Sequence, residues 1–108
     1  MLYELREYTA VPGRLPALVR RFKDHTLPLF RKHGMRVVFM SLTEVGDNSS
    51  NELVYVMQFD SYQELQDRWA GFVADPDWQA IKQKSEVDGA LVAKVHRRLL
   101  NAAPFESA

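Results

Sequence analysis

The chain has 108 residues, of which 46% are hydrophobic and 26% are charged, as is typical of one globular domain and not of a disordered segment. Its 14 basic residues equal its 14 acidic ones, which gives no sign of a nucleic-acid partner or a membrane surface. Cysteine is absent, so disulfides, thiolate metal sites and a cysteine nucleophile are excluded. The chain start has no signal-peptide pattern and no apolar stretch approaches roughly 20 residues. We therefore expect a cytoplasmic protein.

The first half of the sequence predicts a strand, a helix and a second strand. Residues 2–9 alternate as a strand does, with Tyr3, Leu5 and Glu7 on one face. The other face would carry Leu2, Glu4, Arg6 and Tyr8. Apolar residues at helical spacing predict a helix over residues 14–33, and Gly34 suits its C-terminal cap. Because Pro28 cannot bond back to residue 24, we expect a kink or break near Leu27. Residues 36–44 have the β-branched and aromatic content of a strand.

The second half of the sequence predicts a hairpin, two more helical segments and a last strand. A turn-rich run, residues 46–51, precedes a strand over residues 52–59. Asp60 and Ser61 can cap one helix, and Asp75-Pro76 is a helix start with aspartate at the N-cap and proline at the first position. Residues 91–100 predict the last strand. Residues 101–108 are expected to form a C-terminal tail, in which Phe105 suggests a docking contact.

The predicted order is β-α-β-β-α-β, so the fold class is α+β, a ferredoxin-like sandwich in one domain over residues 1–100. Both faces of the sheet are apolar. In the third strand, Leu53, Tyr55, Met57 and Phe59 oppose Val54 and Val56; in the second, Val37 and Phe39 oppose Val38, Met40 and Leu42. Two helices can cover only one face. We therefore expect a homodimer that buries the other face between two sheets.

Short motifs along the chain resemble the NIPSNAP family. They are Tyr3-Glu4-Leu5-Arg6-Glu7-Tyr8, Pro12-Gly13, His33-Gly34, Asn51-Glu52-Leu53-Val54-Tyr55 and Asp75-Pro76-Asp77-Trp78. The resemblance implies a dimeric α+β barrel, in a superfamily that includes small cofactor-independent monooxygenases and isomerases. It does not imply one activity. The longer mitochondrial members carry extra N-terminal sequence that this chain lacks.

Two residues are candidates for a catalytic role. His25 follows Phe22 by three positions and precedes Leu29 by four, which places it on the sheet-facing side of the predicted helix as a possible general base. Arg6 could clamp a carboxylate or enolate. The structural alternatives are a hydrogen-bonded histidine at the edge of the core and a salt bridge from Arg6 to Glu4, Glu7 or a partner subunit.

Four aromatic residues are candidates for walls of a ligand pocket. They are Tyr3, Trp69, Phe72 and Trp78, which could hold a flat organic ligand or belong to the core or the dimer contact. His33 is expected to cap the end of a helix and interact with its dipole, and His96 is expected at a solvated or rim position of the sheet. His25 and His33 would lie about 12 Å apart along a helix, so we predict no metal site, and no cofactor motif is present.

Two functions remain open from the sequence. The first is a barrel that binds a small organic ligand, possibly as a monooxygenase- or isomerase-like enzyme without metal or flavin. The second is a non-catalytic dimeric module for interaction or stress response. The fold alone cannot choose between them, because one scaffold hosts unrelated chemistries.

Overall fold

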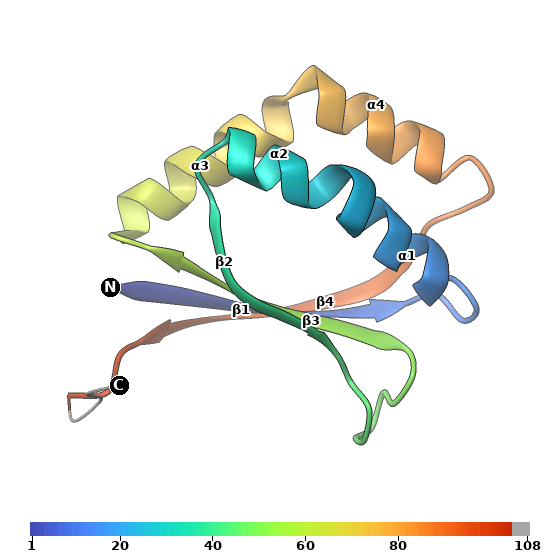
Figure 1. The fold of residues 1–108 in the computed structure, drawn as a ribbon, viewed down its shortest axis with the longest axis horizontal. Helices are drawn as coiled ribbons and strands as arrows, with labels where there is room; N and C mark the ends of the chain where they lie inside the picture. The colour runs from blue at the N-terminus through green and yellow to red at the C-terminus, as the bar shows by residue number, and fades with distance from the viewer. Residues whose placement is uncertain (105–108) are drawn as a thin grey trace.

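The computed structural model describes residues 1–104 and has the predicted ferredoxin-like order (Figure 1). Four strands form one antiparallel sheet in the order β2-β3-β1-β4. They are β1 (Leu2–Ala10), β2 (Arg36–Leu42), β3 (Glu52–Phe59) and β4 (Val92–Asn101). The two central strands, β3 and β1, are joined over eight residue pairs from Leu2–Phe59 to Thr9–Glu52. The prediction of an α+β, ferredoxin-like domain is therefore confirmed.

The first helical region is continuous but contains a π-helical turn. Helix α1 (Leu15–Arg21) leads into η1 (Phe22–Thr26), which leads into α2 (Leu27–Lys32). The Leu27 N–H bonds to the Phe22 carbonyl, five residues back, and the backbone torsions at Thr26 and Leu27 stay right-handed helical. Pro28 thus enters at the start of a new α-helical segment, where its missing N–H costs little. The irregularity expected near Leu27 is a π turn and not a break.

The other helices begin where the sequence predicts. Helix α3 (Tyr62–Ala74) has Ser61 as its N-cap, whose side chain accepts from the Glu64 N–H. Helix α4 (Pro76–Ser85) has Asp75 as its N-cap, accepting from the Asp77 N–H at 2.8 Å. These caps satisfy backbone donors that a helix start leaves unpaired. Helices α3 and α4 lie beside α1 and α2 in the same helical layer (Figure 1).

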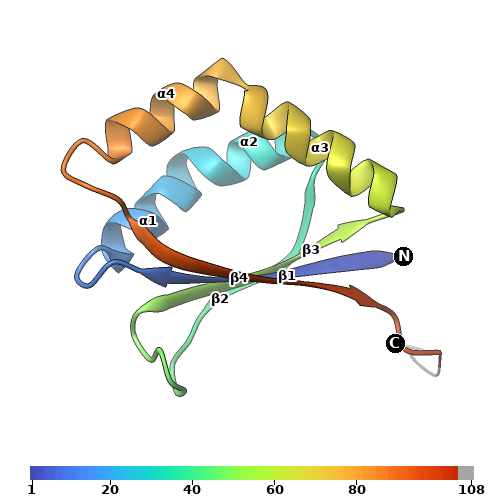
Figure 2. The same cartoon turned by 180° about the vertical axis from the view of Figure 1, so that it is seen from behind.

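All helices lie on one face of the sheet, and the core lies between the two layers (Figures 1 and 2). The helix-facing side chains of β3, from Leu53 to Phe59 at every second position, are almost fully buried. No helix covers the opposite face in either view. Its apolar side chains include Leu5, Val54 and Val56, which are half-buried, and Phe39 and Leu100, which are 51% and 39% exposed. The described chain therefore leaves an apolar sheet face without cover.

The predicted faces of β2 need one correction. Val37 pairs with Met57, but Phe39 pairs with Val56, so the register shifts between them. This bulge at Val38 puts Val37 on the helix-facing side and Phe39 on the uncovered side. A bulge adds one residue to one strand and so reverses the alternation beyond it. Met40, opposite Tyr55, faces the helices.

The last strand runs one residue further than predicted, because Asn101 pairs with Leu2. The predicted tail thus contributes its first residue to β4, and Phe105 lies outside the described residues. No helix within residues 1–104 is long and apolar enough to cross a membrane.

Candidate functional site

A small cavity lies between β1 and the helical layer. Its volume is about 160 Å³. Strand β1 and the α1–η1–α2 region provide most of its polar and aromatic lining, and α3 and α4 close it with tryptophans and a phenylalanine. The lining residues are Arg6, Tyr8, Arg21, Phe22, Thr26, Phe30, Trp69, Phe72, Val73 and Trp78. We call this space the barrel cavity.

A buried glutamate holds the arginine of β1 in place. Glu4 is fully buried and accepts from Arg6 Nη1 at 3.0 Å, from Trp69 Nε1 at 2.6 Å and from Arg97 Nε. The Arg6 guanidinium lies over the Trp69 ring, 4.4 Å from its centroid. A buried carboxylate is tolerated when each oxygen is hydrogen-bonded and its charge is paired. Since one carboxylate pairs with two guanidinium groups, this cluster keeps an excess positive charge.

Two tyrosines extend this network along the sheet. Arg6 Nε donates to the Tyr8 hydroxyl at 3.2 Å, and the Tyr8 and Tyr55 hydroxyls lie 2.8 Å apart. Burial raises the pKa of Tyr55 well above its ordinary value, so this phenol stays protonated. Burial lowers the pKa of Arg6, but Tyr55, Tyr8 and Glu4 raise it by more, so this guanidinium stays charged. Both groups therefore keep the protonation states that donate hydrogen bonds.

The π turn supplies a second pair of polar residues. Arg21 ends α1 and Thr26 ends η1, and both side chains line the barrel cavity. Arg21 Nη1 donates to Glu86 at 2.8 Å and to Ser85 at 3.2 Å. Arg21 Nε and Thr26 Oγ1 are buried and have no hydrogen-bond partner within residues 1–104. Such a group costs about 1–3 kcal/mol when left unpaired, and in native proteins it calls for an explanation.

Aromatic rings form the remaining wall. Trp69 and Phe72 meet edge to face, with centroids 5.6 Å apart, and the Trp78 ring lies tilted against Phe72 at 4.8 Å. Arg6 lies against the first ring of this series and Arg21, at 5.3 Å, against the last. Each guanidinium is thus held by a carboxylate on one side and an indole on the other. The wall is aromatic, and cations flank it.

The charge of the lining is one-sided. Two arginines line the barrel cavity, whereas no aspartate or glutamate of the described residues does. Glu4 and Glu86 lie behind the arginines and hold them. Placement of two guanidinium groups in a small, largely buried space favours a negatively charged occupant.

The structure brings four of the predicted site residues together. Arg6, Trp69, Phe72 and Trp78 all line the barrel cavity. Arg6 also forms the salt bridge to Glu4 that was the structural alternative. The salt bridge is therefore present, and the role of Arg6 as a clamp for a ligand stays a prediction.

One predicted placement is wrong, that of His25, and one candidate, Tyr3, lies on its predicted face but away from the cavity. His25 is exposed and borders a groove beside α4 with Ile81 and Lys84, because the π turn rotates it away from the sheet. Tyr3 pairs with Gln58 and faces the uncovered side of the sheet, since strand side chains alternate and Arg6 faces the helices. Neither residue reaches the barrel cavity.

The other histidines lie at the surface. His33 Nε2 is 2.7 Å from Asp75 Oδ2, which ties the end of α2 to the start of α4. His96 is exposed on β4, opposite Glu7. No group of three or more histidine, aspartate or glutamate side chains in residues 1–104 could hold a metal ion.

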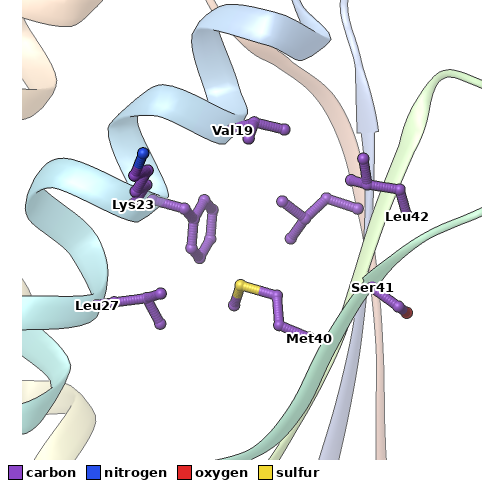
Figure 3. A pocket seen from close by; sticks show the side chains of 8 residues that line it. Val19, Lys23, Leu27, Met40, Ser41 and Leu42 are labelled. Carbon is purple, nitrogen blue, oxygen red and sulfur yellow. The ribbon is translucent and has the colours of Figure 1, made fainter.

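Another space of similar volume, about 160 Å³, lies between η1 and β2. Figure 3 shows Leu27 and Met40 pointing into it from opposite sides, with Val19 and Leu42 nearby. Among its lining residues only Lys23 and Ser41 are polar, and Ser41 Oγ already donates to the Val54 carbonyl. This space has no converging polar groups, so it is a weaker candidate for recognition of a specific ligand.

Sequence reasoning missed Tyr8, Tyr55, Arg21 and Thr26 as site residues. A signal existed for Tyr8, because Glu4, Arg6 and Tyr8 form an unbroken polar row on the strand face that the helices cover. Buried polar side chains need hydrogen-bond partners, so a row of them on a covered strand face indicates a hydrogen-bonded network that could belong to a functional site. Thr26 carried no such signal, because its orientation depends on the π turn, whereas Arg21 lies before that turn, three residues after the buried Leu18.

Comparison with known proteins agrees with this architecture. The sequence model of the NIPSNAP family matches residues 3–107. A NIPSNAP family protein with unknown function from Agrobacterium tumefaciens is 26% identical, with a TM-score of 0.84 over 98% of this chain and 91% of that one. No curated protein matches this chain.

Two further solved structures share the fold. An uncharacterized NIPSNAP domain protein from Burkholderia xenovorans is 23% identical, with a TM-score of 0.84 and full coverage of both chains. The protein PA3566 from Pseudomonas aeruginosa is 19% identical, with a TM-score of 0.62 over 94% of this chain and 93% of that one. With a family match over nearly its whole length, this chain belongs to the NIPSNAP family.

Proposed function

We propose that the barrel cavity binds a small, planar organic anion and that the chain works as a homodimer. The observation that carries the first proposal is the lining itself. Arg6 and Arg21 flank an aromatic wall, and Arg21 Nε and Thr26 Oγ1 are buried without partners in residues 1–104. A ligand oxygen would give such groups the hydrogen bonds that the protein does not.

The volume fits one ring. A cavity of about 150 Å³ is large enough to bind benzene, and the barrel cavity is of similar size. Rings stack on aromatic walls, and carboxylates pair with guanidinium groups. Benzoate is therefore a suitable probe.

Binding is better supported than turnover. Apart from the arginines, the only titratable side chain that lines the cavity in the described residues is Tyr8. A monooxygenase- or isomerase-like reaction needs a group that takes a proton from the ligand, and the predicted base, His25, lies elsewhere. Such activity stays a prediction.

The second part of the proposal, the homodimer, is supported by the uncovered sheet face. Phe39 is half exposed there beside Val56, in a sheet whose other face is the one the helices cover. Two copies of this face would bury their apolar side chains against each other. The same surface would suit a non-catalytic interaction module, which is the second candidate function. The absence of cysteine supports a reducing compartment, and we propose the cytoplasm.

A pair of variants tests ligand binding. Val73 lines the cavity yet is 56% exposed, so it lies at the cavity mouth, and Val73→Phe should narrow the entrance without disturbing the core. We expect calorimetry to show benzoate binding to the unmodified protein and binding at least about tenfold weaker to Val73→Phe, a loss of about 1.4 kcal/mol.

The matched control is Val87→Phe, at a position that is 80% exposed and does not line the cavity. It should bind benzoate as the unmodified protein does. Equal weakening by both variants, or no binding by the unmodified protein, would overturn the proposal.

A further inference from the structure

The hydrogen bonds around Tyr8 fix the direction in which its hydroxyl points. The Tyr8 oxygen receives one hydrogen bond from Arg6 Nε. Its other neighbour is the Tyr55 hydroxyl, at 2.8 Å, and this is the only side-chain hydrogen bond that Tyr55 makes within the described residues. Tyr55 is fully buried. Only one of the two hydroxyl protons can lie between these oxygens, so the other proton has no partner among the described residues.

Tyr55 is the donor in that pair. If Tyr55 accepted from Tyr8, the proton of its own hydroxyl would be buried without an acceptor, which is costly. With Tyr55 as the donor, the Tyr8 oxygen receives two hydrogen bonds, from Arg6 and from Tyr55. The proton on the Tyr8 hydroxyl is then left without a partner among the described residues. Tyr8 lines the barrel cavity, so this proton is available to a bound ligand.

We infer that Tyr8 is a specificity-determining residue that donates its hydroxyl proton to an oxyanion of the ligand, and that Tyr55 is a positioning residue that sets this direction. The inference rests on the proposed function, since it names the ligand group that the same cavity selects. That group is an oxygen that only accepts hydrogen bonds, as in a carboxylate or an enolate. An amide of the same shape offers one accepting oxygen, which carries no full charge, so it receives a weaker hydrogen bond and binds less tightly.

Arg6 strengthens this selection. Its Nε and Nη1 are engaged by Tyr8 and Glu4, and its plane is held against Trp69, so the guanidinium cannot turn away. The ligand therefore meets a hydroxyl donor and a fixed positive charge side by side. Hydrogen bonds of this charge-assisted kind are stronger than neutral ones.

The test compares two probes of nearly equal shape, benzoate and benzamide. Calorimetry on the unmodified protein should show benzoate binding more tightly than benzamide. Tyr8→Phe should reduce this preference by about tenfold or more, as expected when a hydrogen bond to a charged group is lost. Tyr62→Phe, at an exposed position outside the cavity, should leave the preference unchanged.

Tyr55→Phe tests the positioning role. It leaves the Tyr8 hydroxyl in place but frees it to turn, so the preference for benzoate should fall by less than in Tyr8→Phe. A purely structural role would lower the stability of the fold and leave the ratio of the two affinities unchanged.

A measurement on the unmodified protein avoids any dependence on the variants. Benzoate, but not benzamide, should produce a hydroxyl proton NMR signal shifted downfield. If benzoate binds while Tyr8→Phe keeps the full preference, or no such signal forms, the inference is wrong although the proposed function stands. If neither probe binds, both fall.

Discussion

The buried hydroxyl of Thr26, which lines the barrel cavity, is a single group that lowers the stability of the fold. Its side chain is 2% exposed, and its hydroxyl has no partner in the described residues. Helical threonine usually bonds to a carbonyl three or four residues back, but the π turn has displaced that geometry, with the Phe22 carbonyl accepting from Leu27 instead. We interpret the hydroxyl as kept for a ligand.

This interpretation predicts that Thr26→Val stabilises the ligand-free protein. Valine has nearly the same shape and removes the unpaired hydroxyl, so the free energy of unfolding should rise by about 1 kcal/mol. Urea denaturation measures the change. The control is Thr43→Val, which should destabilise, because Thr43 Oγ1 donates to Glu52 at 2.6 Å. Lower stability of Thr26→Val would show that the hydroxyl has a partner after all.

At the scale of elements, the junction of α2 with α4 depends on one carboxylate. Asp75 accepts from Lys32 Nζ at 2.8 Å, from His33 Nε2 at 2.7 Å and from the Asp77 N–H. These hydrogen bonds, with that from Lys32 as the largest cause, hold the pKa of Asp75 well below its usual 3.8. The side chain both caps α4 and ties it to the end of α2.

The pH dependence follows from that lowered pKa. Because the folded state binds this proton less readily than the unfolded state, the stabilisation is present above the ordinary pKa and is lost as pH falls through the lower, folded pKa. Asp75→Asn keeps a capping side chain but removes the charge. The stability difference from the unmodified protein should be largest near pH 7 and shrink below about pH 4.

Acid-dependent denaturation curves of the two proteins measure that difference. Asp77→Asn serves as the control, because Asp77 is exposed and its oxygen is 3.7 Å from Lys32. That variant should change the curve little. A difference for Asp75→Asn that persists unchanged at pH 3 would contradict the electrostatic explanation.

Element order and most strand faces could be predicted from the sequence, because they follow from a two-residue period that the chain keeps. The row Leu53, Tyr55, Met57 and Phe59 faces the core as its spacing indicates. The helix starts at Ser61 and Asp75 could also be predicted, because each side chain accepts a hydrogen bond from a backbone N–H two or three residues further along the chain. Sequence patterns predict a strand face or a helix start correctly where only residues close in the sequence determine it.

The errors arose where one residue is inserted into a regular period. The bulge at Val38 moved Phe39 to the other face, and the π turn moved His25 away from the sheet while placing Thr26 in the cavity. Both insertions depend on packing against other elements, which a helical or strand period cannot reveal. The candidate site was thus only half predictable, through Arg6 and the aromatic wall.

At the scale of the whole molecule, the uncovered sheet face leads to a prediction about assembly. Native mass spectrometry should show a dimer. Phe39→Glu should weaken dimerisation by more than about tenfold, since burying an unpaired charge costs several kcal/mol. Phe39 is half exposed in the single chain, so the fold should tolerate the change.

Val45→Glu is the control for assembly, at a loop position that is 91% exposed. It should dimerise normally. A monomer at micromolar concentration for the unmodified protein would contradict the sheet-to-sheet dimer, while a dimer that Phe39→Glu leaves intact would place the interface elsewhere.

The central claim is that the barrel cavity is the ligand site, and the two tryptophans of the chain allow a direct test. Both Trp69 and Trp78 line that cavity, and the chain contains no others. Each indole N–H gives its own signal in a nitrogen–proton correlation spectrum. On titration with benzoate, both indole signals should move together with the backbone amide of Thr26, and they should saturate at one common concentration. Unmoved indole signals, or shifts confined to residues such as Val19 and Leu42 around the other space, would contradict the account.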